Sequence, residues 1–188
     1  MTASSAIRSP EYREDPELDA HVTRLRTKAE AADNCDWISP GEFGVWGSGT
    51  VAQLSNRFEA VSFPTGADSR ASVTRKRKRT WTGGGNIIAT VYYTGSASSA
   101  TDFTIQQVGF EFAVGDGLAA KSAAVNQGES VAGTATASDL ASHTFDNYFP
   151  IACDGDLFTF QLRRAGTDSN SGAFYIIGVE LEFYRDHA

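Results

Sequence analysis

Hydrophobic and polar residues alternate along several stretches in the second half of the chain. A period of two is typical of β-strands that bury one face. The pattern is clearest at residues 173–185, and it recurs at residues 103–114 and 156–164. The residues expected on the buried face of the last stretch are Ala173, Tyr175, Ile177, Val179, Leu181 and Phe183, and those expected on its other face are Glu180, Glu182 and Tyr184.

Clusters of Gly, Ser, Asn and Asp divide residues 54–188 into about eight candidate strands. This number and spacing predict a mainly β fold, an antiparallel β-sandwich of the jelly-roll type. Residues 86–95 are apolar on both faces, which predicts a central strand covered on both sides. The predicted strands are 54–63, 71–82, 86–95, 103–114, 128–136, 142–151, 156–164 and 173–185.

The first 53 residues have a different pattern. Residues 1–15 are polar and predict an extended arm, and Asp15, Pro16 and Glu17 suit the start of an α-helix over residues 16–36. Gly and Pro among large apolar residues predict a packed linker over residues 37–53. Apolar residues along the helix repeat every three or four positions, a spacing shared by an amphipathic helix on its own domain and by a self-association or docking helix. These positions are Leu18, Val22, Leu25, Ala29 and Ala32.

Composition agrees with a folded, turn-rich β protein, because 41% of the residues are hydrophobic and 18 are Gly. The formal charge is -7, and residues 80–188 carry 12 acidic groups against 4 basic ones. A protein that binds nucleic acid needs a broad basic face, so we expect no nucleic-acid partner.

The chain shows neither an apolar leader at its start nor a stretch long enough to cross a bilayer, so we expect no membrane insertion.

Residues 75–79 form an unbroken basic run. In a strand, Arg75, Arg77 and Arg79 would point to one side. One interpretation is a solvated edge strand that its charges protect from aggregation. The other is a docking stripe for an acidic neighbour.

Catalytic and metal-binding patterns are weak. His21, His143 and His187 suggest no grouping with a nucleophile, and Cys35 and Cys153 lack the spacing of a redox or zinc motif. Carboxylates at turns lack the spacing of a calcium loop. We therefore expect no catalytic residue, no metal and no cofactor.

Aromatic residues offer another kind of site. Trp81, Tyr92 and Tyr148, together with Trp37, Trp46 and Tyr93, would suit sugar-stacking platforms in a carbohydrate-binding sandwich. Burial in a core or an interface explains aromatic residues equally well.

Residues 80–184 resemble a family of tailed-bacteriophage structural proteins. The resemblance lies in Trp81 and in four segments. It implies a jelly-roll-like sandwich that occurs in phage particles as decoration, fibre or tail-associated subunits, usually homotrimers. Ser171 and Gly172 depart from the Gly-Asp pair that precedes the alanine in that family. The segments are Gly85-Asn-Ile-Ile-Ala-Thr-Val-Tyr-Tyr-Thr, Val108-Gly-Phe-Glu-Phe, Gly155-Asp-Leu-Phe-Thr-Phe-Gln-Leu-Arg-Arg and Asp168-Ser-Asn-Ser-Gly-Ala-Phe-Tyr-Ile-Ile-Gly-Val-Glu-Leu-Glu-Phe-Tyr.

The resemblance leads to a first hypothesis of a non-enzymatic virion protein, a capsid-surface decoration (cement) or head-fibre-like subunit. Its partners would be copies of itself in a homotrimer and other virion proteins such as the major capsid protein. It would assemble in the host cytoplasm and reside in the virion. The alternatives are a tail or fibre adhesin that binds host surface glycan, and a carbohydrate-binding module.

Overall fold

The computed structural model describes the β-rich part of the chain. The predicted arm lies outside the described residues, and so does the predicted helix up to residue 34, with the docking positions Leu18, Val22, Leu25 and Ala29. The described residues are 35–55, 58–76, 85–96, 101–113, 115, 125–134, 139–145, 149–151 and 157–185.

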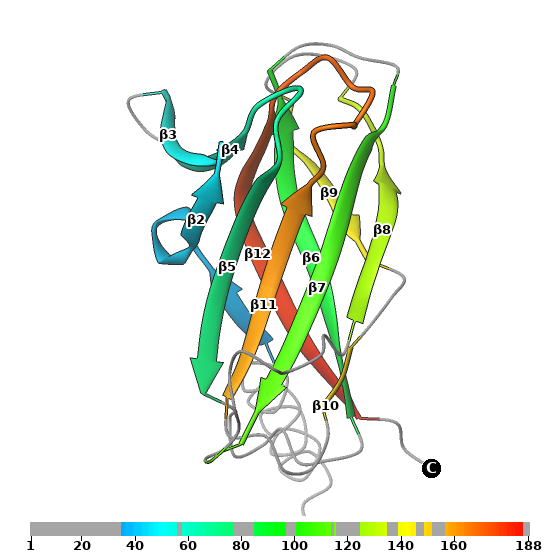
Figure 1. Cartoon of the computed structure of the whole chain (residues 1–188). Helices are drawn as coiled ribbons and strands as arrows, with labels where there is room; N and C mark the ends of the chain where they lie inside the picture. The colour runs from blue at the N-terminus through cyan, green and yellow to red at the C-terminus, as the bar shows by residue number, and fades with distance from the viewer. Residues whose placement is uncertain are drawn as a thin grey trace, which may run out of the picture. The chain divides into compact units, whose positions relative to one another are not determined.

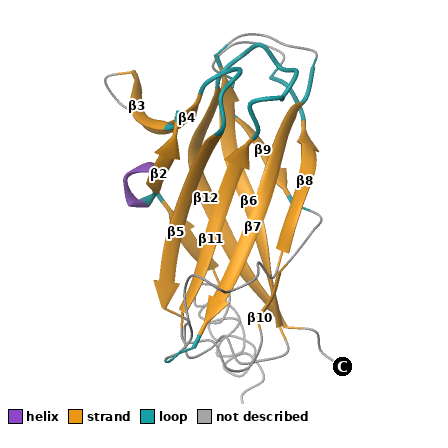
Figure 2. Ribbon diagram, in the orientation of Figure 1, coloured by secondary structure: helices purple, strands orange, loops and turns teal. Residues whose placement is uncertain are grey.

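Two antiparallel sheets face each other in the described residues, as Figures 1 and 2 show. Successive strands switch repeatedly between the sheets, which confirms a mainly β, jelly-roll-like sandwich. The seven-stranded sheet has the order β10 (Phe149–Ile151), β6 (Gly85–Gly95), β12 (Phe174–Arg185), β4 (Phe58–Phe63), β3 (Thr50–Ser55), with β1 (Cys35–Ile38) beside β12 and β9 (Ala141–Thr144) beside β6. The five-stranded sheet has the order β2 (Gly44–Gly47), β5 (Ser69–Lys76), β11 (Leu157–Arg164), β7 (Phe103–Phe112), β8 (Val125–Val131).

Residues 37–53 differ from the linker that their Gly and Pro content suggested. They contain the end of β1, the short 3-10 helix η1 (Pro40–Glu42), all of β2 and most of β3. Pro40 and Gly47 lie where the chain turns between strands, and Gly47 has a φ of 70°. The sandwich therefore includes these residues. The predicted strand 54–63 contains the end of β3 and all of β4, two strands that pair with one another.

The core lies between the sheets and is rich in aromatic rings. The Phe174 ring stacks on Tyr93 with centroids 4.8 Å apart and meets Phe103 edge-on at 4.9 Å. The centroid of the Phe63 ring lies 6.5 Å from that of Phe174. Burying a side chain of this size contributes about 1.5 to 3 kcal/mol, so this cluster is a major source of stability.

A β-bulge in β12 corrects the predicted faces of the last strand. Pairing with β6 shifts register between Ile176 and Gly178. Phe174 and Ile176 are fully buried, whereas Tyr175 and Ile177, which we expected in the core, are only half-buried. One extra residue exchanges the two faces of a strand, so the alternation holds only from Val179 onward.

Strand β6 has neighbours on both sides, as predicted for a central strand. It pairs with β12 along one edge and with β9 and β10 along the other. Its outer positions Ile88, Thr90 and Tyr92 are half-buried, so the predicted cover on both faces is only partial.

Gln107 of β7 is a polar residue in the apolar interior. It lies opposite Leu162, is fully buried, and neither atom of its amide has a hydrogen-bond partner in the described part of the chain. A buried amide without a partner costs about 1 to 3 kcal/mol. We therefore expect Gln107→Met to raise the free energy of unfolding by a similar amount in a denaturant titration.

The exposed Gln53 of β3 supplies the matched control for this substitution. Gln53→Met should change stability by less than about 0.5 kcal/mol. A loss of stability in Gln107→Met would contradict the prediction and would indicate a buried water on the amide.

Candidate functional site

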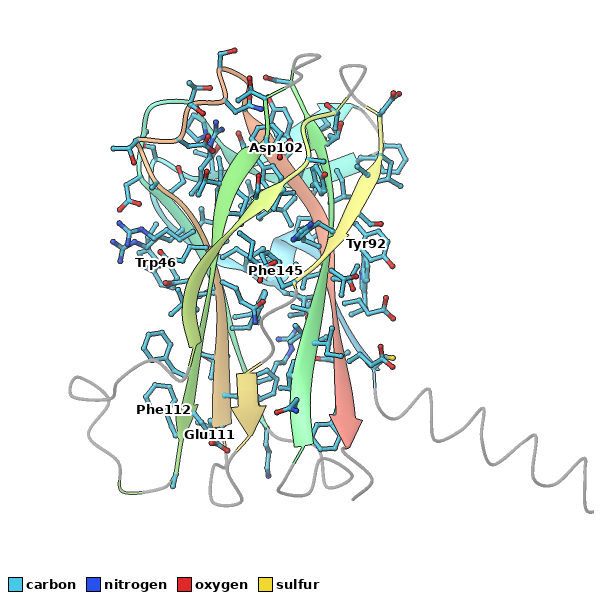
Figure 3. All side chains as sticks on the ribbon, turned by 90° about the vertical axis from the view of Figure 1, so that its right-hand side faces the viewer. Trp46, Tyr92, Asp102, Glu111, Phe112 and Phe145 are labelled. Carbon is cyan, nitrogen blue, oxygen red and sulfur yellow. The ribbon has the colours of Figure 1, made fainter. Side chains whose placement is uncertain are left out.

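Two tryptophans lie on opposite outer faces of the sandwich. Trp46 of β2 is 54% exposed on the five-stranded sheet, and Trp37 of β1 is 52% exposed on the seven-stranded sheet. Figure 3 shows Trp46 on one side of the sandwich and Tyr92, a neighbour of Trp37, on the other. A large aromatic side chain that remains this exposed is a candidate contact for a ligand or partner.

Trp46 borders an open hollow of about 510 Å³. Strand pairing explains why residues from separate strands meet at this hollow. Trp46 lies opposite Arg70 of β5, and Arg70 lies opposite Arg163 of β11. Residues that face one another across a sheet point to the same side. We call this site the Trp46 hollow, and it is lined by Trp46, Gly47, Asp68, Arg70 and Gln161.

Backbone contacts from two other segments hold Asp68 at the rim. The Ser48 N–H donates to the Asp68 carbonyl oxygen at 3.1 Å. A Cβ at Gly47 would lie 2.3 Å from that oxygen, and a Cβ at Gly166 would lie 3.2 Å from the Asp68 nitrogen. The turn after β2 and the turn after β11 both approach this closely because each has a glycine there.

Two guanidinium groups bind the Asp68 carboxylate. Arg163 donates through Nε to Oδ1 at 2.8 Å and through Nη2 to Oδ2 at 3.3 Å, and Arg70 Nη2 donates to Oδ2 at 3.1 Å. The hydrogen bond from Arg163 is the largest cause that lowers the pKa of Asp68 below its ordinary value. Asp68 is therefore ionised at neutral pH, and the three groups carry a net charge of +1.

The Trp46 hollow combines a flat aromatic surface with hydrogen-bonding groups of fixed geometry. Sites for small polar ligands usually pair apolar or aromatic walls with a few placed polar groups. An indole face accepts the C–H side of a sugar ring, and guanidinium and amide groups bind its hydroxyls. The arrangement is suited to a sugar.

The face around Trp37 is packed differently. The Trp37 ring lies on Gly178 at the bulge of β12 and meets the Tyr92 ring at 5.5 Å. The Tyr92 hydroxyl donates to Glu180 Oε2 at 3.1 Å, and this hydrogen bond raises the pKa of Tyr92. Trp37 and Tyr92 therefore pack against one another and against β12.

Gly178 is expected to be required for the position of Trp37. A Cβ at residue 178 would lie 2.2 Å from the Trp37 ring, so Gly178→Ala displaces that ring from Tyr92. We expect a loss of about 1 kcal/mol in the free energy of unfolding, comparable to one aromatic pair. Urea titrations of a double-mutant cycle measure it.

In a Trp37→Ala background the clash disappears. Gly178→Ala should then be neutral or stabilising, because alanine restricts the unfolded chain more than glycine does. An equal loss in both backgrounds would contradict the role assigned to Gly178.

The predicted docking and glycan residues are only partly described. Arg75 is half-buried and forms ion pairs with Asp36 at 3.1 Å and with Glu42 at 2.5 Å. These contacts join β5 to β1 and η1. The docking role of Arg75 stays a prediction. The other predicted residues, Arg77, Arg79, Trp81 and Tyr148, lie outside the described residues.

The described residues offer little for metal or acid-base chemistry. Within them, no group of three or more His, Cys, Asp or Glu is placed to hold a metal ion. His143 Nε2 lies 3.2 Å from Glu129 Oε2 and so links β9 to β8 of the other sheet. No helix in this part of the chain has the length and apolar character needed to span a membrane.

No protein-family model matches the chain, and no curated protein matches its sequence. Solved structures do share its fold. A CBM36-1 domain of a multidomain xylanase from the hindgut metagenome of Trinervitermes trinervoides has a TM-score of 0.53 and 13% identity over 79% of this chain and 96% of that domain.

Two larger proteins contain a similar part. The isomalto-dextranase of Arthrobacter globiformis T6, solved with panose, has a TM-score of 0.59 at 15% identity, and the Cry4Aa toxin of Bacillus thuringiensis has a TM-score of 0.53 at 13% identity. Each match covers 79% of this chain but only 23% of the larger one. At these identities the likeness is one of fold: the chain is a β-sandwich of the kind found in carbohydrate-binding modules.

Proposed function

We propose that the chain is a non-catalytic glycan-binding protein whose binding site is the Trp46 hollow. The observation that carries the proposal is the exposed Trp46 indole beside Asp68, Arg70 and Gln161 in an open depression. The site holds one aromatic platform and polar groups of both kinds, donors and acceptors. A sugar ring presents the complementary pair, an apolar face and a rim of hydroxyls.

The fold supports this proposal. The CBM36-1 domain named above is matched over nearly its whole length, so an entire carbohydrate-binding module has the architecture of this sandwich. Glycan binding also agrees with two of the functions expected from sequence, the tail-fibre adhesin and the carbohydrate-binding module. A location in a virion, a homotrimer and contact with a major capsid protein stay predictions from the family resemblance.

A glycan array followed by calorimetric titration tests the proposal. The full chain should bind a defined set of glycans, and Trp46→Ala should weaken the strongest hit at least about tenfold, which corresponds to about 1.4 kcal/mol. Trp37→Ala is the matched control, because it removes an equally exposed indole from the other sheet.

The expected result for Trp37→Ala is an unchanged affinity for that hit. Absence of binding to any glycan, or binding that depends on Trp37 and not on Trp46, would contradict the proposal.

A further inference from the structure

The charges of the Trp46 hollow favour one class of sugar. Asp68 and Arg70 of its lining bring one charge of each sign, and Arg163, which binds Asp68 from beside the hollow, brings a second positive charge. Guanidinium N–H groups already contact both carboxylate oxygens of Asp68, one at Oδ1 and two at Oδ2. Asp68 therefore has little capacity left to accept hydrogen bonds from sugar hydroxyls.

The hydrogen-bond donors of Arg70, unlike the acceptors of Asp68, are mostly without a protein partner in the described part of the chain. An arginine side chain has five N–H donors, and Arg70 directs only its Nη2 group to Asp68 within the described residues. Its Nε group, its Nη1 group and the second N–H of Nη2 are left for a ligand, and the Arg70 side chain is 44% exposed. On the edge that Asp68 leaves free, the second N–H of Nη2 pairs with an N–H of Nε or Nη1, and such a pair matches the two oxygens of a carboxylate.

We infer that the Trp46 hollow selects sugars that carry a carboxylate, with the ring on Trp46 and the carboxylate on Arg70. This inference rests on the proposed function and names its ligand class. A neutral sugar would bring no negative charge to balance the net charge of +1 on the group of Asp68, Arg70 and Arg163. A hexuronic acid satisfies both the charge and the stacking surface.

Competition titrations at physiological salt test the inference with three probes: a hexuronic acid, the neutral hexose of the same stereochemistry, and acetate. The hexuronic acid should bind at least tenfold more tightly than the hexose, and acetate should bind far more weakly than either. Arg70→Gln should reduce binding of the acid more than binding of the hexose, so the preference falls. Arg70→Lys keeps the charge but loses the paired donors, and it should restore the preference only in part.

Asp68→Asn separates this inference from its main rival. If the ligand is a carboxylate, removing a competing negative charge should maintain or increase affinity for the hexuronic acid. If Asp68 instead accepts hydroxyl groups of a neutral sugar, the same variant should lose binding. Lys76→Gln is the charge control: Lys76 lies six residues along β5 from Arg70, about 20 Å away, beyond the Debye length of about 8 Å, so it should not change the preference.

The outcomes distinguish the inference from the proposed function. Equal or tighter binding of the neutral hexose through Trp46 would overturn the carboxylate preference and leave glycan binding intact. Loss of hexuronic acid binding in Asp68→Asn, with the fold verified by circular dichroism, would also overturn it. Acetate that binds as well as the hexuronic acid would reduce the site to an anion site and overturn the inference. No saccharide binding by the wild-type chain would contradict the proposed function itself.

Discussion

Arg164→Met is expected to lower the free energy of unfolding by about 3 to 5 kcal/mol, because it leaves a buried carboxylate without its cation. The side chains of Arg164 and Asp168 are both fully buried, and Arg164 Nε lies 2.9 Å from Asp168 Oδ2. The Arg164 guanidinium also lies 5.1 Å from the centroid of the Phe103 ring. Its remaining donors bind the backbone carbonyls of Phe63 at 2.9 Å, Gly172 at 2.7 Å and Asn170 at 2.7 Å.

Arg163→Met is the matched control, since Arg163 is the preceding residue of β11 and its ion pair with Asp68 is solvent-exposed. It should cost less than about 1 kcal/mol. In thermal unfolding, the Arg164 variant should melt about 6 to 20 °C lower. Equal effects of the two substitutions would contradict the importance assigned to the buried pair.

The Arg164–Asp168 pair also supports the candidate site. Asp168 accepts hydrogen bonds from the backbone N–H groups of Thr104 and Asn170, so it holds the β11–β12 connection in place. Gly166 of that connection packs against the backbone of Asp68. A change at Arg164 is thus expected to disturb the Trp46 hollow as well as the core.

Phe174→Ala should produce a loss of similar size, about 3 to 5 kcal/mol, through the cavity it leaves. The Phe174 ring contacts the rings of Tyr93, Phe103 and Phe63, which come from three other strands on both sheets. These rings cannot close the space without moving the strands that carry them. Equilibrium denaturation with guanidinium measures the loss.

Phe58→Ala is the control for this substitution, because the Phe58 side chain is 60% exposed on β4. Its removal creates no internal cavity and should change stability by less than about 0.5 kcal/mol. A comparable loss in the two variants would contradict the central place of Phe174 in the core.

The β-sandwich could be predicted from sequence because most of its strands bury only one face. In β11 the alternation is regular, so Phe158, Phe160 and Leu162 were assigned to the core as the structure has them. In β7 the consecutive residues Gln107, Val108 and Gly109 are all buried, so the alternation there is interrupted. The bulge of β12 could not be predicted in this way. It lies at Gly178, where the ring of Trp37 packs closely, and these two residues are distant in sequence.

The Trp46 hollow was harder to predict than the fold. Trp46 could be recognised as an aromatic candidate, but nothing local connects it with Asp68 or Gln161. Their proximity arises from the pairing of β2 with β5 and of β5 with β11. The residues around Trp46 were assigned to a packed linker, because glycine and proline are common in such segments. In the structure Gly47 instead allows the close approach of its backbone to Asp68.

Nuclear magnetic resonance tests the central claim most directly, because the chain has only three tryptophans and each gives one indole N–H signal. The signals of Trp46 and Trp37 are assigned with Trp46→Phe and Trp37→Phe. On addition of the glycan found by array, the Trp46 signal should shift in a saturable way while the Trp37 signal stays in place. A saturable shift at Trp37 with none at Trp46 would contradict the account.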